Sequence, residues 1–277
     1  MRIDKKMRRG FTLVELLVVL AIIALLIAIL LPVLKRAKES ANTVKCMAQQ
    51  RQIMTATMMY VQENKGRFPL PPSIGDMYSP TSTAWQNSSL MYYMDPARPN
   101  GVIRYDAGSL WPYLSPGANR NPTAAVSKTH SAVLEQIMNC PSEPREARVI
   151  FLGGIAGYDR NFSYSWNVQM GRVDSPYQPY ISRTTRMKGS SHKILLIEEM
   201  APNDGVCWVQ FELNDPDDVP SFRHNGRACF GFGDGHVETL EPTQMGWERI
   251  KTGSLNQHPR PIDMNKNHYY FALHVDQ

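Results

Sequence analysis

The sequence lacks the short motifs that mark many enzyme families. It contains no His-Glu-x-x-His, no Gly-x-Ser-x-Gly, no phosphate-binding P-loop and no zinc-spaced set of cysteines. The glycine-rich run 231–235 lacks the last glycine of the dinucleotide-binding fingerprint, so we interpret it as a turn. We therefore expect no catalytic residue and no enzymatic activity.

A strong excess of positive charge is also missing outside the amino terminus. The 277-residue chain has a net charge of +5, but residues 1–10 hold five Lys or Arg and one Asp, which supply most of it. The rest of the chain is close to neutral. Because nucleic-acid-binding domains carry clustered basic residues, we expect no nucleic-acid partner.

Cysteine is scarce, and no Cys-x-x-Cys pair occurs. An even number of cysteines in an oxidising compartment permits two disulfides, in one of three connectivities. We favour Cys46 with Cys140 and Cys207 with Cys229. The alternative is that all four are buried free thiols, which pack as small apolar residues.

Charge is nearly absent from the run Phe11–Leu34, where Glu15 is the only ionisable residue. At about 1.5 Å per residue the run forms about 36 Å of helix, enough to cross a hydrocarbon core about 30 Å thick. A secretory signal has a shorter apolar region followed by an Ala-x-Ala-like site, whereas this run ends in Lys35 and Arg36. An uncleaved signal anchor stays open as the alternative.

Four features of this amino-terminal segment occur together. A basic leader ends at Gly10, Phe11 follows, Glu15 is the lone acid, and Pro32 stands at position 22 counted from Phe11. They resemble the class III signal of type IV pilins and type II secretion pseudopilins. The resemblance implies cleavage between Gly10 and Phe11 by a prepilin peptidase, N-methylation of Phe11, a helix kink at Pro32, and assembly with other pilin-like subunits.

Glu15 needs a physical explanation, because a carboxylate at the centre of a membrane-spanning helix costs about 2.5 to 3.5 kcal/mol. It lies about 6 Å along the helix from Phe11, so it can reach toward the interface. In pilin-like filaments the resemblance implies a better partner, the amino terminus of a neighbouring subunit. The flanking charges only slightly favour a cytoplasmic leader. The resemblance implies a single-pass inner-membrane protein with its head in the periplasm or outside the cell.

The helix is predicted to continue beyond the apolar run to about Asn64, giving a helix of about 80 Å from Phe11. Arg51 interrupts an otherwise apolar stripe, and Gly66 with the prolines that follow ends the helix. The stripe, which we expect to pack on the head, consists of Val44, Met47, Met54, Met58 and Val61.

Further motifs resemble a large pseudopilin-like family that carries the prepilin-processing-associated H-X9-DG domain. His224 is followed by nine residues and then by Asp234-Gly235, the pattern for which the domain is named. The other matching segments are Cys46–Pro69, which contains Gln52, Tyr60 and a Gly-x-Phe-Pro end, Cys140-Pro141-Ser142, and Tyr164-Ser165-Trp166-Asn167.

Residues 70–180 favour short strands and loops, whereas 193–240 carries the clearest strand pattern. We expect an antiparallel meander of Lys193–Glu198, Val206–Leu213, Ala228–Phe232 and His236–Leu240, with Asp234-Gly235 in a type I′ turn. The predicted fold is α+β and pilin-like, a long helix on an antiparallel sheet with long irregular loops. The predicted parts are a leader 1–10, a membrane helix 11–34, its amphipathic continuation 35–66, and a head 67–277 that includes the H-X9-DG region 193–240.

Two sets of side chains were weighed as sites. One set, considered as a metal or acid/base site, consists of His224, Asp234, His236, Glu198 and Glu199. We interpret these residues as structural, because ten residues of strand place His224 and Asp234 up to about 33 Å apart. The acidic loop with Asp215, Asp217 and Asp218 is a weak candidate for calcium, and we expect no other cofactor.

We predict a structural filament subunit. The alternative is a membrane-anchored glycan-binding module, which would use aromatic residues, and a third possibility is an anchored hydrolase that uses Glu198 or Asp218. Aromatic residues in an irregular β region more often pin loops to the core. The aromatic residues in question are Trp85, Tyr92, Tyr93, Trp111 and Tyr113.

Overall fold

The structure is a computed structural model. It describes residues 12–69, 93–94, 103–104, 108–115, 136–143, 149–152, 155–159, 162–167, 183–187, 189–199, 206–207, 220–221 and 223–245. Contacts divide the chain into two units, Met1–Ala41 and Asn42–Gln277. The helix α1 contributes residues to both units.

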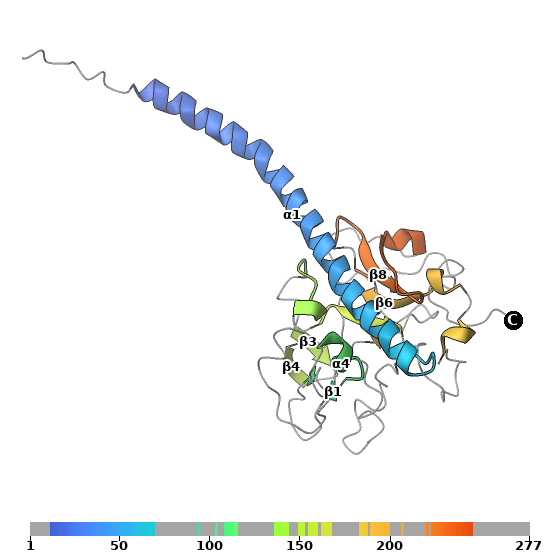
Figure 1. Cartoon of the computed structure of the whole chain (residues 1–277). Helices are drawn as coiled ribbons and strands as arrows, with labels where there is room; N and C mark the ends of the chain where they lie inside the picture. The colour runs from blue at the N-terminus through green and yellow to red at the C-terminus, as the bar shows by residue number, and fades with distance from the viewer. Residues whose placement is uncertain are drawn as a thin grey trace, which may run out of the picture. The chain divides into compact units, whose positions relative to one another are not determined.

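Helix α1 runs from Leu13 to Glu63 (Figure 1), a span of 51 residues and about 77 Å. The predicted long helix is confirmed, although Phe11 lies outside the described residues. In the first unit its large apolar side chains from Leu13 to Leu34 are exposed. By length and composition, α1 is the one candidate membrane span among the described residues.

The end of α1 is set by backbone conformation. Lys65 and Gly66 both have positive φ, and the Gly66 N–H donates to the Val61 carbonyl at 2.8 Å. Reversing the chain in this way satisfies a carbonyl that the helix end would leave free. The helix therefore ends at Glu63, as the position of Gly66 predicted.

The second half of α1 packs in the head through a face that partly matches the predicted stripe, since Met54 and Val61 are buried as predicted. Val44 is 68% exposed, and Met47 and Met58 are only partly buried. The prediction followed the large apolar residues alone, whereas the buried face also contains small and polar residues. The buried residues of α1 are Cys46, Gln49, Gln50, Ile53, Met54, Ala56, Thr57 and Val61.

The main sheet of the head has the strand order β7-β5-β6-β8-β9. Four of its strands are antiparallel neighbours, β5 (Tyr164–Asn167), β6 (Ile194–Glu198), β8 (Ala228–Phe232) and β9 (Val237–Leu240). The class is therefore α+β, with a long helix packed on an antiparallel sheet, which is consistent with a pilin-like fold. Figure 1 shows α1 together with β6 and β8.

The predicted meander is wrong at one strand. The segment β7 (Val206–Cys207) pairs parallel with β5 at the sheet edge instead of lying between β6 and β8. Strand β6 instead pairs directly with β8, in the antiparallel direction. Every residue of these two strands is buried, as expected for strands at the centre of a covered sheet. Residues 208–213 lie outside the described residues.

The hairpin of β8 and β9 is confirmed, but its turn is not type I′. The Phe232 N–H donates to the His236 carbonyl at 2.9 Å, and the Gly235 N–H donates to the Phe232 carbonyl at 2.8 Å. Among the loop residues 233–235, only Gly235 has a positive φ, of 94°. These features describe a three-residue loop, a type I turn closed by a left-handed glycine.

The remaining described elements are short. Two antiparallel hairpins form from β1 (Tyr93–Met94) with β2 (Ile103–Arg104) and from β3 (Val149–Leu152) with β4 (Ile155–Asp159). The helical segments are α4 (Trp111–Leu114), η3 (Thr184–Arg186), η4 (Ser190–His192) and η5 (Pro242–Met245).

Candidate functional site

The first candidate site is the amino-terminal end of α1. Glu15 Oε2 accepts hydrogen bonds from the Thr12 backbone N–H at 2.9 Å and from the Thr12 hydroxyl at 2.8 Å. In return, the Glu15 N–H donates to the Thr12 hydroxyl at 3.3 Å. This reciprocal arrangement is a capping box, which the Thr-x-x-Glu spacing could have revealed in the sequence. Glu15 thus has a partner within its own chain, while the cleavage site at Gly10 and Phe11 lies outside the described residues.

Pro32 lies inside α1, and the helix continues on both sides of it. Proline has no N–H, so the Ala28 carbonyl loses its usual helical donor, and a proline in a helix interior costs about 3 kcal/mol. The predicted position of Pro32 within one continuous helix is confirmed, and the kink stays a prediction.

The second candidate site is a buried cluster of four side chains in the head. Each residue is 2% exposed or less, and the four potential ligand atoms all lie within 4.8 Å of one another. The members come from four separate segments: Cys46 from α1, Cys140 from the loop after the helical residues 136–138, Glu198 from the end of β6, and His224 from the turn before β8.

His224 lies between two of the other members. Its Nε2 is 3.2 Å from Glu198 Oε2 and 3.4 Å from Cys140 Sγ. The Cys229 backbone N–H donates to the same Glu198 oxygen at 3.0 Å, and the other oxygen of Glu198 is 3.3 Å from an Arg223 nitrogen. Both oxygens of this fully buried carboxylate are therefore engaged.

A second layer of polar groups holds the cluster. Arg223 pairs with Glu143 at 3.1 Å and donates to the Glu199 carbonyl at 2.9 Å. The Ser163 hydroxyl donates to Glu143 and accepts the Cys140 backbone N–H at 2.8 Å. The segment around Cys140 is thereby fixed to the start of β5.

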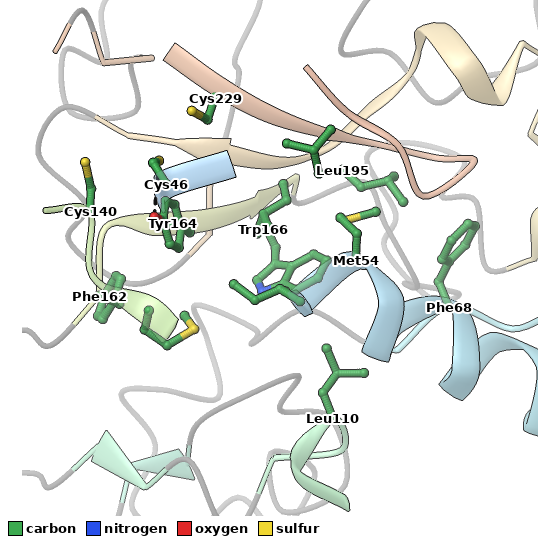
Figure 2. Packing of buried hydrophobic residues seen from close by; sticks show 14 of the residues in the cluster. Cys46, Met54, Phe68, Leu110, Cys140, Phe162, Tyr164, Trp166, Leu195 and Cys229 are labelled. Atoms are coloured by element: carbon green, nitrogen blue, oxygen red, sulfur yellow. Dashed lines mark hydrogen bonds between the residues drawn. The ribbon is translucent and has the colours of Figure 1, made fainter. Parts of the chain in front are cut away.

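The two thiols of the cluster also have polar neighbours. The Ser142 backbone N–H donates to Cys140 Sγ at 3.4 Å. The Tyr164 hydroxyl lies 3.2 Å from Cys46 Sγ and 2.8 Å from Gln49 Oε1. Figure 2 shows Cys46 beside Tyr164 with a dashed line between them, and Cys140 and Cys229 nearby. Cys46 therefore lies among hydrogen-bonding groups although the site is buried.

The electrostatics of the cluster favour a charged pair of Glu198 and His224. Burial raises the pKa of Glu198, but the hydrogen bond and charge of His224 and the charge of Arg223 outweigh it and lower that pKa. Burial lowers the pKa of His224, but its contacts with Cys140 and Glu198 raise it overall. Burial also raises the pKa of the Cys46 thiol. Without a bound cation, Cys46 is therefore a neutral thiol beside an ion pair.

The structure joins only part of the predicted polar set. His224 and Glu198 meet in the cluster, whereas Asp234 lies in the β8–β9 turn, where its Oδ1 accepts the His236 backbone N–H at 3.1 Å and lies 2.5 Å from His236 Nδ1. Between His224 and Asp234 lie a turn and the five-residue strand β8, so fewer residues are extended than the ten that the expectation assumed. The cysteines of the cluster were missed as partners of His224, because no local spacing connects them.

The two predicted disulfides have different outcomes. All four cysteines are buried, and none is bonded to another in this structure. Cys207 lies on β7 and Cys229 on β8, three strand spacings or about 14 Å apart, whereas a disulfide needs Cα atoms within about 4.4 to 6.8 Å. The pairing of Cys207 with Cys229 is therefore wrong. The pairing of Cys46 with Cys140, whose sulfurs lie within 4.8 Å, stays a prediction.

The aromatic residues that suggested glycan binding are engaged in packing where they are described. Trp111 is 2% exposed in the core. The Tyr113 hydroxyl donates to Glu63 at 2.5 Å, and its ring packs edge-on against Tyr60 with centroids 6.1 Å apart. Trp111 therefore packs α4 against the core, and Tyr113 holds it against α1. Trp85 and Tyr92 lie outside the described residues, and only the backbone of Tyr93 is described.

The acidic residues proposed for calcium or hydrolysis give no accessible site in the described part of the chain. Asp215, Asp217 and Asp218 lie outside it, so the calcium loop stays a prediction. Glu198 is fully buried and paired with Arg223 and His224, so it has no access to an external substrate.

Comparison with known proteins gives one finding. Residues 5–31 match the family model of the prokaryotic N-terminal methylation motif, a span that includes Gly10, Phe11 and Glu15. No curated protein and no solved structure matches the chain. The chain therefore carries a prepilin-type processing motif, and the H-X9-DG resemblance at His224, Asp234 and Gly235 stays a prediction.

Proposed function

We propose that this protein is a structural subunit of a type IV pilus-like or type II secretion filament. The observation that carries the proposal is the methylation motif at residues 5–31, which overlaps the start of α1, where the large apolar side chains from Leu13 to Leu34 are exposed. Exposed apolar area of this extent needs lipid or other apolar helices around it. A filament core of identical or related helices supplies such neighbours after release from the membrane.

The subunit is first held in the inner membrane, with its leader in the cytoplasm and its head in the periplasm. A prepilin peptidase then cuts between Gly10 and Phe11 and methylates the new amino terminus. Cleavage brings a positive charge to within a few residues of Glu15. In the separate chain Glu15 is bound to Thr12, and in the filament the amino terminus of a neighbouring subunit competes for the same carboxylate.

The experiment that tests this proposal is mass spectrometry of the amino terminus of the native protein. We expect the mature chain to begin at N-methylated Phe11. The matched variants are Gly10→Leu, which should block cleavage, and Arg2→Leu, which leaves the cleavage site unchanged and should be processed. A native protein with an intact Met1, or one cut beyond Leu34, would contradict the proposal and leave only an anchored module.

A further inference from the structure

The buried cluster of Cys46, Cys140, Glu198 and His224 in the head has the composition of a metal site. We propose that Cys46, Cys140, Glu198 and His224 bind one Zn²⁺ ion in the folded head. The proposal is independent of the filament role, because every ligand belongs to residues 42–277, and none lies in the amino-terminal motif.

The donor set selects the metal. Two thiolates, one imidazole and one carboxylate suit Zn²⁺, whereas calcium and magnesium prefer oxygen alone. Zn²⁺ bound by two thiolates and a neutral imidazole has no net charge, and Arg223 lies 3.3 Å from Glu198 and 3.1 Å from Glu143. Counting these two carboxylates and Arg223, the loaded site carries one net negative charge.

The spacing of the ligand atoms is compatible with a tetrahedral site. With metal–ligand distances of about 2.0 to 2.3 Å, neighbouring ligand atoms in a tetrahedron lie roughly 3.3 to 3.8 Å apart. The distances from His224 Nε2 are 3.2 Å to Glu198 Oε2 and 3.4 Å to Cys140 Sγ. No pair among the four ligand atoms exceeds 4.8 Å, so coordination requires a contraction of about 1 Å at most.

Groups outside the ligands hold them in place. The Ser142 N–H donates to Cys140 Sγ, and a hydrogen bond of this kind stabilises a thiolate. The Tyr164 hydroxyl lies 3.2 Å from Cys46 Sγ. The Cys229 N–H orients the carboxylate of Glu198. A simple ion pair of His224 and Glu198 leaves the two adjacent thiols unexplained, whereas coordination uses all four side chains.

The ion would join α1 to the sheet. Its ligands come from residues far apart in the chain, from Cys46 to His224, so binding would fix the helix, the Cys140 loop, β6 and the turn before β8 to one point. An ion that binds only the folded head stabilises it by mass action. We therefore assign the site a structural role, with no open position for a substrate.

The test uses the full-length protein, purified in detergent without chelators. Elemental analysis should find about one zinc per chain, and exchange with Co²⁺ should give the thiolate charge-transfer and intense visible bands of a tetrahedral site. Cys46→Ser and His224→Ala should each lower the zinc content at least tenfold. Cys207→Ser is the matched control, because Cys207 is equally buried but packs in a separate cluster, and it should keep its zinc.

The outcomes separate the alternatives. A metal-free native protein that also gives no tetrahedral Co²⁺ spectrum overturns the proposal, as does a Cys46–Cys140 disulfide found by mass spectrometry of the unreduced protein. Zinc that stays bound in the Cys46→Ser variant overturns it too. The Co²⁺ spectrum of the unmutated protein reports on the ligands directly, so the test does not depend on the variants folding.

Discussion

At the scale of single residues, the packing of the head depends on residues whose size or charge fits the groups around them. Gly231 is one example, because a Cβ atom there would lie 2.7 Å from Met54 Cγ and 3.1 Å from Leu196 Cβ. The helix can lie this close to β8 only because the strand has no side chain at that point. Arg223 is another, since it lies between two buried carboxylates.

Gly231→Ala should lower the free energy of unfolding by about 1 to 3 kcal/mol, because the added methyl group overpacks the contact between helix and sheet. Chemical denaturation of the detergent-solubilised protein measures this. In a Met54→Ala background the same substitution should cost less, because Met54 Cγ and Sδ, its nearest contacts, are gone. An equal cost in both backgrounds would show that Met54 is not the cause.

Arg223→Met should lower the free energy of unfolding by about 3 to 5 kcal/mol, because it removes the cation that lies between the buried carboxylates of Glu143 and Glu198. Arg51→Met is the matched control, since Arg51 is exposed on α1, and its effect should stay within about 0.5 kcal/mol. Thermal unfolding of the two variants side by side makes the comparison. Similar effects would contradict a special role for Arg223.

At the scale of elements, the region 224–240 shows what each part of the H-X9-DG pattern does in this chain. His224 lies in the turn that enters β8, the residues of β8 cross the sheet, and Asp234-Gly235 forms the loop that returns the chain into β9. The Asp234 side chain holds the loop through His236, whose ring stacks on Phe232 with centroids 4.3 Å apart. The pattern therefore places its histidine and its turn at opposite ends of one strand.

Gly235→Ala should destabilise the hairpin by about 1 to 2 kcal/mol, because alanine disfavours the positive φ of 94° at this position. Gly235→Asn should cost less, since asparagine accepts left-handed conformations more readily while adding the same Cβ atom. Urea denaturation of both variants provides the measurement. An asparagine variant as unstable as the alanine variant would point to the contact with Met58, which a Cβ at 235 would approach to 3.0 Å.

At the scale of the whole molecule, one helix serves two environments. Its first half exposes apolar side chains along its whole length, whereas its second half buries a face of mixed polarity in the head. Two amides on that face bind to the head: Gln49 accepts the Tyr164 hydroxyl at 2.8 Å, and Gln50 donates to the Cys229 carbonyl at 3.0 Å. The same element therefore presents an apolar surface in its first half and forms part of the core with its second.

Glu15→Gln should leave membrane insertion unchanged and abolish or strongly reduce filament assembly, because a neutral amide cannot meet the charge of a neighbouring amino terminus. Fractionation of membranes and electron microscopy of sheared filaments measure the two steps. Glu39→Gln, on the same helix beyond the apolar run, is the control and should assemble. Normal filaments from Glu15→Gln would leave its carboxylate with only the capping role to Thr12.

Local signals were enough to predict the amino-terminal helix, its end near Gly66 and the hairpin at Asp234-Gly235. Each depends on residues adjacent in the chain, such as an unbroken apolar run, a glycine that accepts positive φ, or a turn between two strands. The sequence by itself also determined the processing motif, since Gly10, Phe11 and Glu15 lie within one short segment that the family model matches.

Only the tertiary structure decided which distant residues meet. The place of β7 beside β5, the buried face of α1, and the meeting of Cys46, Cys140, Glu198 and His224 all depend on contacts between segments separated by tens of residues. Such contacts leave no periodic pattern in the chain, because their partners are chosen by burial and charge once the sheet has packed on the helix.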